Sequence, residues 1–280
     1  MQTFKFMTIL ISGATILGLS ACSNGDVTST SEATIADTTI TETIESVETT
    51  KATVVTQTTE PATEITAETE PFIRPECSVA DITCNIGDQV EYGSFIVNSD
   101  GDSSPITWTC LDIQDGKALL LSDKVLDCRM YHGALVDTTW AECDLRAWLN
   151  DDFISMAFTP DEASCIWYSD IVNDNNPTSI VSGGANTIDQ IFILDYDELN
   201  TYFADDEARL CLPTEYAVDN GCWTSDFQVS EGCTNYWLRN PGLFASRAGY
   251  VFLNGAIISD GDFVNQTFVG VRPAMWVKIA

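Results

Sequence analysis

Two neighbouring stretches of the chain combine apolar and β-branched residues over lengths typical of strands. They are residues 106–113 and 117–122, and Asp115-Gly116 lies between them. Short runs of this kind on either side of an Asp-Gly pair are typical of an antiparallel hairpin with a tight turn. The pattern therefore predicts two paired strands.

The C-terminal part shows the same kind of pattern. Residues 236–239 predict a strand that Asn240-Pro241-Gly242 ends, and residues 250–253 and 256–259 flank Asn254-Gly255, a dipeptide that favours a type I′ turn. Residues 269–279 predict a closing strand. Pro273 lacks a backbone N–H, so it places part of that strand at an edge or a bulge.

Helix-start patterns occupy the middle of the chain. Thr139 and Glu142 fit a capping box, and they precede Leu145, Trp148 and Leu149 at helical spacing. A second box begins at Thr159, which is followed by a proline and then by Glu162.

A third helix is predicted after a short buried strand at residues 191–194, with Asp195 and Glu198 at its start. Helices in the middle of the chain and hairpins at both ends predict an α+β fold with antiparallel sheets and a few short helices.

The first residues have the features of an export signal. Lys5 precedes an apolar stretch from Phe6 to Leu17, which is too short to span a bilayer comfortably. Leu19-Ser20-Ala21-Cys22 resembles the lipobox of bacterial lipoproteins. The resemblance implies that residues 1–21 are a signal peptide, that Cys22 carries the lipid, and that the mature chain is anchored to the membrane and faces outside the cytoplasm.

Residues 22–71 are rich in Thr and acidic residues and contain no aromatic residue. Such a segment cannot bury enough apolar area to offset its chain entropy, so we expect a disordered tether. Residues 72–280 are then expected to form a single globular domain. A tether of this length would give the domain reach across a thick cell wall, which favours a Gram-positive cell.

The net charge of the chain disfavours two classes of binding partner. The chain has 42 acidic and 12 basic side chains and a formal net charge of −30. A field of this sign repels nucleic acid and anionic lipid headgroups, so neither is an expected partner.

A series of motifs resembles one bacterial family. The motifs are PITWTCLD, KALLLSDKVLDCRMYH, TTWAECDLRAWLN, NTIDQIFILDYDELNTYF, YWLRNPG, GYVFLNGAI and GVRPAMW. They resemble the domain-of-unknown-function 6273 family, found in exported proteins and lipoproteins of anaerobic Firmicutes, over roughly residues 86–280. The late motifs also look like the C-type-lectin-like fold of formylglycine-generating enzymes, and this second resemblance bears on the fold more than on the activity.

Besides Cys22 there are nine cysteines, an odd number, so at least one is free or pairs with another chain. Export permits disulfides. Cys77 with Cys84, and then Cys222 with Cys233, are the expected local pairs. With no C-x-x-C motif and His132 as the single histidine, a metal site is not expected, and no cofactor is implied. The oxygen-rich residues 170–176 lack EF-hand spacing, so we expect a polar loop there.

Arginines in apolar strand contexts allow two interpretations. In the first, Arg146, Arg239 and Arg272 are structural and pair with buried carboxylates or carbonyls. In the second, aromatic faces and polar groups line a ligand pocket. The residues of that pocket would be Trp223, Tyr236, Trp237, Arg239, Asn240 and Arg247.

The resulting hypothesis is a surface-displayed lipoprotein whose domain binds a glycan or a protein without catalysis. The alternative is a cell-surface enzyme, either a hydrolase or an oxidase of the formylglycine-generating type, which would need two reactive cysteines in a cleft. A third is a purely structural domain that assembles with other surface proteins.

Overall fold

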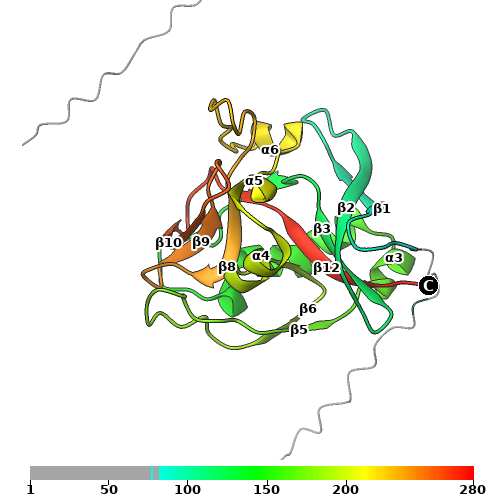
Figure 1. The fold of residues 1–280 in the computed structure, drawn as a ribbon, viewed down its shortest axis with the longest axis horizontal. Helices are drawn as coiled ribbons and strands as arrows, with labels where there is room; N and C mark the ends of the chain where they lie inside the picture. The colour runs from blue at the N-terminus through cyan, green and yellow to red at the C-terminus, as the bar shows by residue number, and fades with distance from the viewer. Residues whose placement is uncertain (1–76, 78–81) are drawn as a thin grey trace, which may run out of the picture. The chain divides into compact units, whose positions relative to one another are not determined.

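The computed structural model describes Cys77 and residues 82–280, shown as the coloured ribbon in Figure 1. The predicted signal peptide (residues 1–21), the lipidation site Cys22 and the predicted tether (residues 22–71) lie outside the described residues. Within the described part, no helix has the length and apolar character needed to cross a membrane.

The first five-stranded sheet has the order β1-β2-β3-β12-β7, and every neighbouring pair in it is antiparallel. Its strands are β1 (Gln89–Ile96), β2 (Ser103–Gln114), β3 (Lys117–Ser122), β7 (Ile191–Ile193) and β12 (Pro273–Lys278). The predicted early hairpin is confirmed as β2 and β3. Asp115 (φ 48°) and Gly116 (φ 70°) both adopt the positive φ values that a type I′ turn requires.

The second five-stranded sheet has the order β10-β9-β8-β11-β4. Its strands are β4 (Asp127–Cys128), β8 (Tyr236–Pro241), β9 (Arg247–Val251), β10 (Ile257–Phe263) and β11 (Gly270–Val271). All pairs are antiparallel except β8 with β11. In Figure 1, β8 to β10 and β1 to β3 lie on opposite sides of β12.

The predicted C-terminal hairpin is present as β9 and β10, but its turn differs from the prediction. Among non-glycine residues of the described part, only Asp115 has a positive φ, so Asn254 does not take a type I′ conformation. Instead Gly255 N–H bonds to Phe252 O, and Gly255 alone is left-handed, with φ 85°. A Cβ on Gly255 would lie 1.7 Å from Asp206 O, so packing against the neighbouring helix selects this turn.

The closing strand also differs from the prediction. It is divided at Arg272 into β11, which belongs to the second sheet, and β12, which lies in the middle of the first. Pro273 is the first residue of β12. At this position its missing N–H does not interrupt the hydrogen bonds of the following residues of the strand. The chain therefore passes from one sheet to the other within a single residue.

A small third sheet pairs β5 (Ser169–Ile171) with β6 (Thr187–Asp189). The polar loop between them is held by its own asparagines. Asn176 Nδ2 donates to Pro241 O at 2.9 Å and to Ser259 O at 2.7 Å, which docks the loop onto the second sheet.

The first predicted capping box is wrong. The Thr139 side chain accepts no backbone hydrogen bond, and residues Trp140–Glu142 form only a 3-10 turn, η1. The helix begins instead with Cys143 as its N-cap and runs as α1 (Asp144–Trp148), a π-helical turn η2 (Leu149–Phe153) and α2 (Ile154–Ala157). Leu145, Trp148 and Leu149 are buried, so the predicted face was right.

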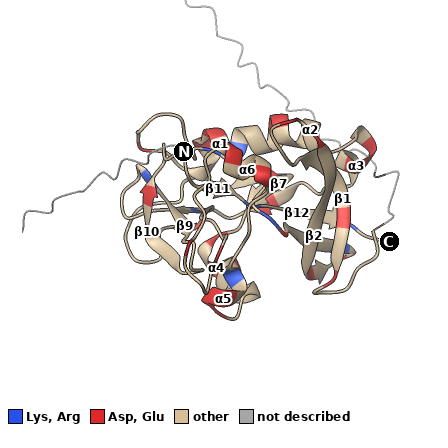
Figure 2. Ribbon diagram, turned by 90° about the horizontal axis from the view of Figure 1, so that it is seen from above, with Lys and Arg blue, Asp and Glu red and all other residues tan. Residues whose placement is uncertain are grey.

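The other two capping boxes are confirmed. Thr159 and Glu162 start α3 (Pro160–Cys165), and Asp195 and Glu198 start α4 (Tyr196–Tyr202), each with both reciprocal hydrogen bonds. Two further short helices follow, α5 (Asp206–Arg209) and α6 (Glu215–Asp219). Figure 2 shows acidic residues on α3, α5 and α6.

Large aromatic and aliphatic side chains from both sheets and from α1, η2 and α2 form one buried cluster, which includes Trp108, Trp140, Phe153, Phe192 and Trp237. The domain is therefore α+β with antiparallel sheets and a few short helices, as the sequence predicts.

The disulfide differs from the expected local pairs. Cys77 is bonded to Cys165 at the end of α3, with a Cα–Cα distance of 4.6 Å, while Cys84, Cys222 and Cys233 are buried free thiols. Closeness along the sequence was the only guide to the pairing, and the fold brings Cys77 alongside α3 instead. The bridge links Cys77, near the N-terminal end of the domain, to the end of α3.

Candidate functional site

Four of the six residues of the predicted ligand pocket are in the core. Tyr236, Trp237, Arg239 and Asn240 lie on β8, and every residue of this strand is buried. Trp237 is completely inaccessible, and its indole N–H donates to Arg129 O at 2.8 Å. A ligand in solution cannot reach these side chains, so the predicted pocket does not exist as drawn from the sequence.

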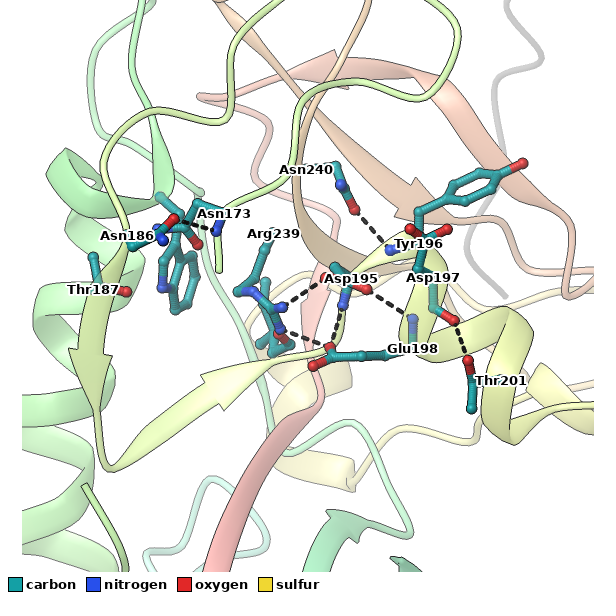
Figure 3. Close-up of polar contacts among 12 residues, drawn as sticks. Asn173, Asn186, Thr187, Asp195, Tyr196, Asp197, Glu198, Thr201, Arg239 and Asn240 are labelled. Atoms are coloured by element: carbon teal, nitrogen blue, oxygen red, sulfur yellow. Dashed lines mark hydrogen bonds and ion pairs between the residues drawn. The ribbon is translucent and has the colours of Figure 1, made fainter. Parts of the chain in front are cut away.

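Arg239 instead connects β8 to the start of α4 (Figure 3). Its Nη2 donates to Asp195 Oδ2 at 2.8 Å and its Nη1 donates to Glu198 Oε2 at 2.7 Å. Burial alone would lower the pKa of Arg239, but Glu198 and Asp195 offset this effect and the pKa is raised. The guanidinium is a permanent cation that ties the capping box of α4 to the sheet.

Arg146 and Arg272 are also engaged with the protein itself. Arg146 Nε donates to the fully buried Asp189 at 2.7 Å, a carboxylate that also accepts from Trp140 Nε1. Arg272 Nε donates to Ser122 O at 3.0 Å, and its guanidinium lies over the ring of Tyr236. Both side chains join segments that are far apart in the sequence.

The two remaining residues of the predicted pocket lie at the surface. Arg247 is half-buried, with its guanidinium over the rings of Phe244 and Phe263. Trp223 is 59% exposed and stacks on Phe268 at a centroid distance of 4.0 Å and an interplanar angle of 9°. One face of the Trp223 ring is thus covered and supported by Phe268.

A pocket of about 450 Å³ opens on the part of the domain formed by β4, α1 and α6. We call it the Arg129 pocket. Its polar and aromatic lining includes Asp127, Arg129, Asp144, Trp148, Tyr216 and Asn220. This volume lies within the range typical of sites for small organic ligands.

Arg129 is held in place by two contacts. Its Nε donates to Asp127 Oδ2 at 2.7 Å, and its guanidinium carbon lies 4.0 Å from the centroid of the Trp148 ring. Among the described residues, no hydrogen bond uses the Nη atoms of Arg129. These donors are therefore fixed in direction and can bind an oxygen-rich ligand.

Asp127 acts as the support of this arrangement. It is buried, and its Oδ1 accepts hydrogen bonds from Asn220 Nδ2 and from Cys128 N, each at 2.7 Å. With both oxygens engaged, this carboxylate orients Arg129 and Asn220 rather than contacting a ligand.

A second carboxylate lies at the rim. Asp144 at the start of α1 accepts from Gly133 N at 2.7 Å and lies 3.2 Å from His132 Nδ1, while its side chain is 65% exposed. The pocket thus combines a cationic donor, an amide, a phenol and an exposed carboxylate acceptor. Donors and acceptors of these kinds can bind the hydroxyl groups of an uncharged ligand.

The Trp223–Phe268 stack adjoins this pocket. Thr267 lines the pocket and precedes Phe268, and Asn220 lies three residues before Trp223. Trp223 N–H also bonds to Phe268 O at 3.5 Å. The aromatic stack is therefore close along the chain to two residues of the pocket, although neither of its rings lines the Arg129 pocket.

Sequence reasoning missed Asp127 and Arg129, although one pattern could have found them. Residues two apart on a strand point to the same face. The side chains of Asp127 and Arg129, on either side of Cys128, would therefore be close enough to form an ion pair. Nothing in the sequence indicated that Trp148 and Asn220, from distant segments, would join them.

The described cysteines do not resemble reactive nucleophiles. Each is buried or in the disulfide. Burial raises the pKa of Cys143 to about 12 and also raises the pKa of Cys211. A reactive cysteine needs the opposite, a lowered pKa and access to solvent. Among the residues described, no group of three or more His, Cys, Asp or Glu side chains is placed to hold a metal ion.

Taken together, fold and site define an antiparallel α+β domain with a polar pocket beside an exposed aromatic stack. A family model described as "Domain of unknown function (DUF6273)" matches residues 115–279, and the chain belongs to this family. The matched segment begins at the turn between β2 and β3 and includes every lining residue of the Arg129 pocket. No curated protein and no solved structure matches the chain.

Proposed function

We propose that this chain is a binding protein of the bacterial cell surface, anchored through lipid on Cys22, and that its domain binds a glycan in the Arg129 pocket. The observation that carries the proposal is the fixed Arg129 guanidinium, held by Asp127 and Trp148 at the edge of a pocket with unused hydrogen-bond donors. Glycans offer the hydroxyl groups and flat apolar ring faces that such a surface can bind.

The Trp223–Phe268 stack supports a saccharide over a small charged metabolite. An aromatic ring with one covered face and one open face is a rigid platform, and a sugar ring can pack its C–H groups on it. The overall charge of −30 disfavours anionic ligands, so a neutral glycan is the better match.

We also retain the proposal of a C-type-lectin-like fold. It is supported by the order of the Trp-and-Arg strand β8, the hairpin β9–β10 and β11, the short strand directly before Arg272, which occupy one sheet. The proposed anchor and tether would display this domain outside the cytoplasm at some distance from the membrane.

Binding is tested with the purified full chain on a glycan array, followed by titration calorimetry on the best ligand. We expect Arg129→Gln to weaken binding by about tenfold or more, because a good charge-assisted hydrogen bond contributes about 1.5–3 kcal/mol. Trp223→Ala is expected to weaken it by a similar factor. A folded chain that binds nothing on the array would contradict the proposal.

Arg247→Gln is the matched control. It removes an arginine that stacks on aromatic rings, as Arg129 does, but does not line the pocket. We expect its affinity to equal that of the unmodified chain. Loss of binding in this variant, with Arg129→Gln unaffected, would place the site at the residues expected from sequence.

The anchor is tested separately, by metabolic labelling with radioactive palmitate and cell fractionation. We expect label in the membrane fraction, lost in Cys22→Ala. Unlabelled protein in the cytosol would overturn the anchored part of the proposal.

A further inference from the structure

Six of the seven buried free thiols of the described residues lie in three adjacent pairs. The first pair is Cys128 and Cys222. Cys128 is opposite Gly270 in the β4–β11 ladder, and a Cβ built on Gly270 would lie 3.0 Å from Cys222 Sγ. The neighbouring Cys222 thiol and burial together raise the pKa of Cys128.

The second pair is Cys211 and Cys233. Thr234 N–H donates to Cys211 O at 2.9 Å, which aligns the two segments side by side. Burial raises the pKa of the Cys233 thiol, and the adjacent backbone of Cys211 acts in the opposite direction.

The third pair is Cys84 and Cys110. Gly87 N–H donates to Cys110 O at 2.8 Å and Cys110 N–H donates to Asp88 O at 2.9 Å, so the segment after Cys84 runs along β2. Burial and the neighbouring Cys84 thiol raise the pKa of Cys110 to about 12.

Cys143 is different, because its contacts are those of a helix cap. Its sulfur accepts from Arg146 N at 3.4 Å and donates to Trp140 O at 3.4 Å at the start of α1. The odd cysteine required by the sequence count therefore has a structural role as a thiol.

We propose that the three thiol pairs close as disulfides in the mature protein, which then has the bridges 77–165, 84–110, 128–222 and 211–233 and keeps Cys143 reduced. The inference rests on the export included in the proposed function, since an oxidising compartment is needed. Thiols on segments that already lie side by side must move only a short way to reach the S–S bond length of about 2.05 Å.

Each closure breaks two S–H bonds and forms one S–S bond. The two electrons and two protons pass to the disulfide of an oxidised thiol–disulfide exchange partner, which is reduced to two thiols. Eight of the nine cysteines beyond Cys22 are then consumed in pairs, so no intermolecular bridge is required.

The bridge 128–222 acts directly on the proposed site. Cys128 lines the Arg129 pocket and lies next to Asp127, and Cys222 precedes Trp223. A covalent link between them fixes the loop with the aromatic platform to the strand that supports Arg129.

The test is non-reducing peptide mapping of the full chain, isolated from the membrane fraction of a secreting bacterial host, with free thiols blocked by N-ethylmaleimide in denaturant so that buried thiols also react. We expect four linked peptide pairs with the stated partners and maleimide on Cys143 alone among residues 72–280. Maleimide on the six pair cysteines, or bridges between other partners, would overturn the proposal.

Single substitutions give an independent check of the partners. Cys222→Ser should add maleimide to Cys128 only, Cys110→Ser to Cys84 only and Cys211→Ser to Cys233 only, while Cys143→Ser should leave every bridge intact. A variant that does not fold leaves the mapping of the unmodified chain decisive. The Cys22 peptide reports lipidation and the array reports binding, so failure of the proposed function is seen in different measurements.

Discussion

Arg239 lies in the core with two carboxylates from one helix turn, Asp195 and Glu198. An isolated charge in such a place would be costly, but the three groups neutralise much of one another's field and satisfy most of one another's hydrogen bonds. This is why an arginine in the middle of a buried strand is compatible with a stable fold.

Replacing Arg239 by methionine removes the cation and keeps a side chain of similar length. We expect Arg239→Met to lower the free energy of unfolding by about 3–5 kcal/mol, because Asp195 and Glu198 would be left without their partner. Urea unfolding followed by circular dichroism measures the loss. Arg247→Met is the control, and a loss below about 1 kcal/mol in Arg239→Met itself would show that the carboxylates are satisfied in another way.

At the level of elements, two Thr-x-x-Glu sequences look alike and behave differently. In α3 the Thr159 hydroxyl caps Glu162 N and the Glu162 carboxylate returns to Thr159 N. At Thr139 the hydroxyl contacts only the Glu142 carboxylate, at 3.3 Å. The sequence at Thr139 is a chance match to the capping-box motif.

The two sites form a matched pair for mutagenesis. We expect Thr159→Ala to destabilise the domain by about 1 kcal/mol, the usual cost of a lost N-cap. Thr139→Ala should lower the stability by only a few tenths of that amount, because the Thr139 hydroxyl caps no backbone group. Equal losses in urea unfolding, or a larger loss at Thr139, would contradict the assignment of the helix start.

The secondary-structure elements also show which features could be predicted from the sequence and which could not. The α+β class, the two hairpins and two helix starts were predictable because they depend on local chemistry at Asp115-Gly116, Thr159 and Asp195. The position of the proposed ligand site could not be predicted, because it depends on which side chains are buried. Trp237 and Arg239 are residue types that are common in ligand sites. Only the burial of both faces of β8 shows that they are interior residues.

Across the whole domain, five tyrosines have a pKa raised above the ordinary value. They are Tyr92, Tyr131, Tyr202, Tyr236 and Tyr250, and burial is the first cause in each. For Tyr202 and Tyr236 the pKa rises to about 12. The folded state therefore holds protons that the unfolded chain loses near pH 10.

This linkage has a definite sign. The stabilisation is fully present below pH 10 and is lost as the pH rises toward 12, so stability should fall across that interval. We expect cooperative alkaline unfolding in which absorbance at 295 nm from the buried tyrosinates appears together with loss of the near-ultraviolet dichroism. If all eight tyrosines ionised near pH 10 while the fold persisted, the burial described here would be wrong.

The division of residues 270–278 between both sheets has a consequence for biogenesis. β11 completes the contact between β4 and β8, and β12 fills the gap between β3 and β7. This stretch is synthesised after all the other described strands, so neither sheet can be completed before it has left the ribosome. The nascent polypeptide would stay loosely organised until then, which suits the proposed export of an unfolded chain.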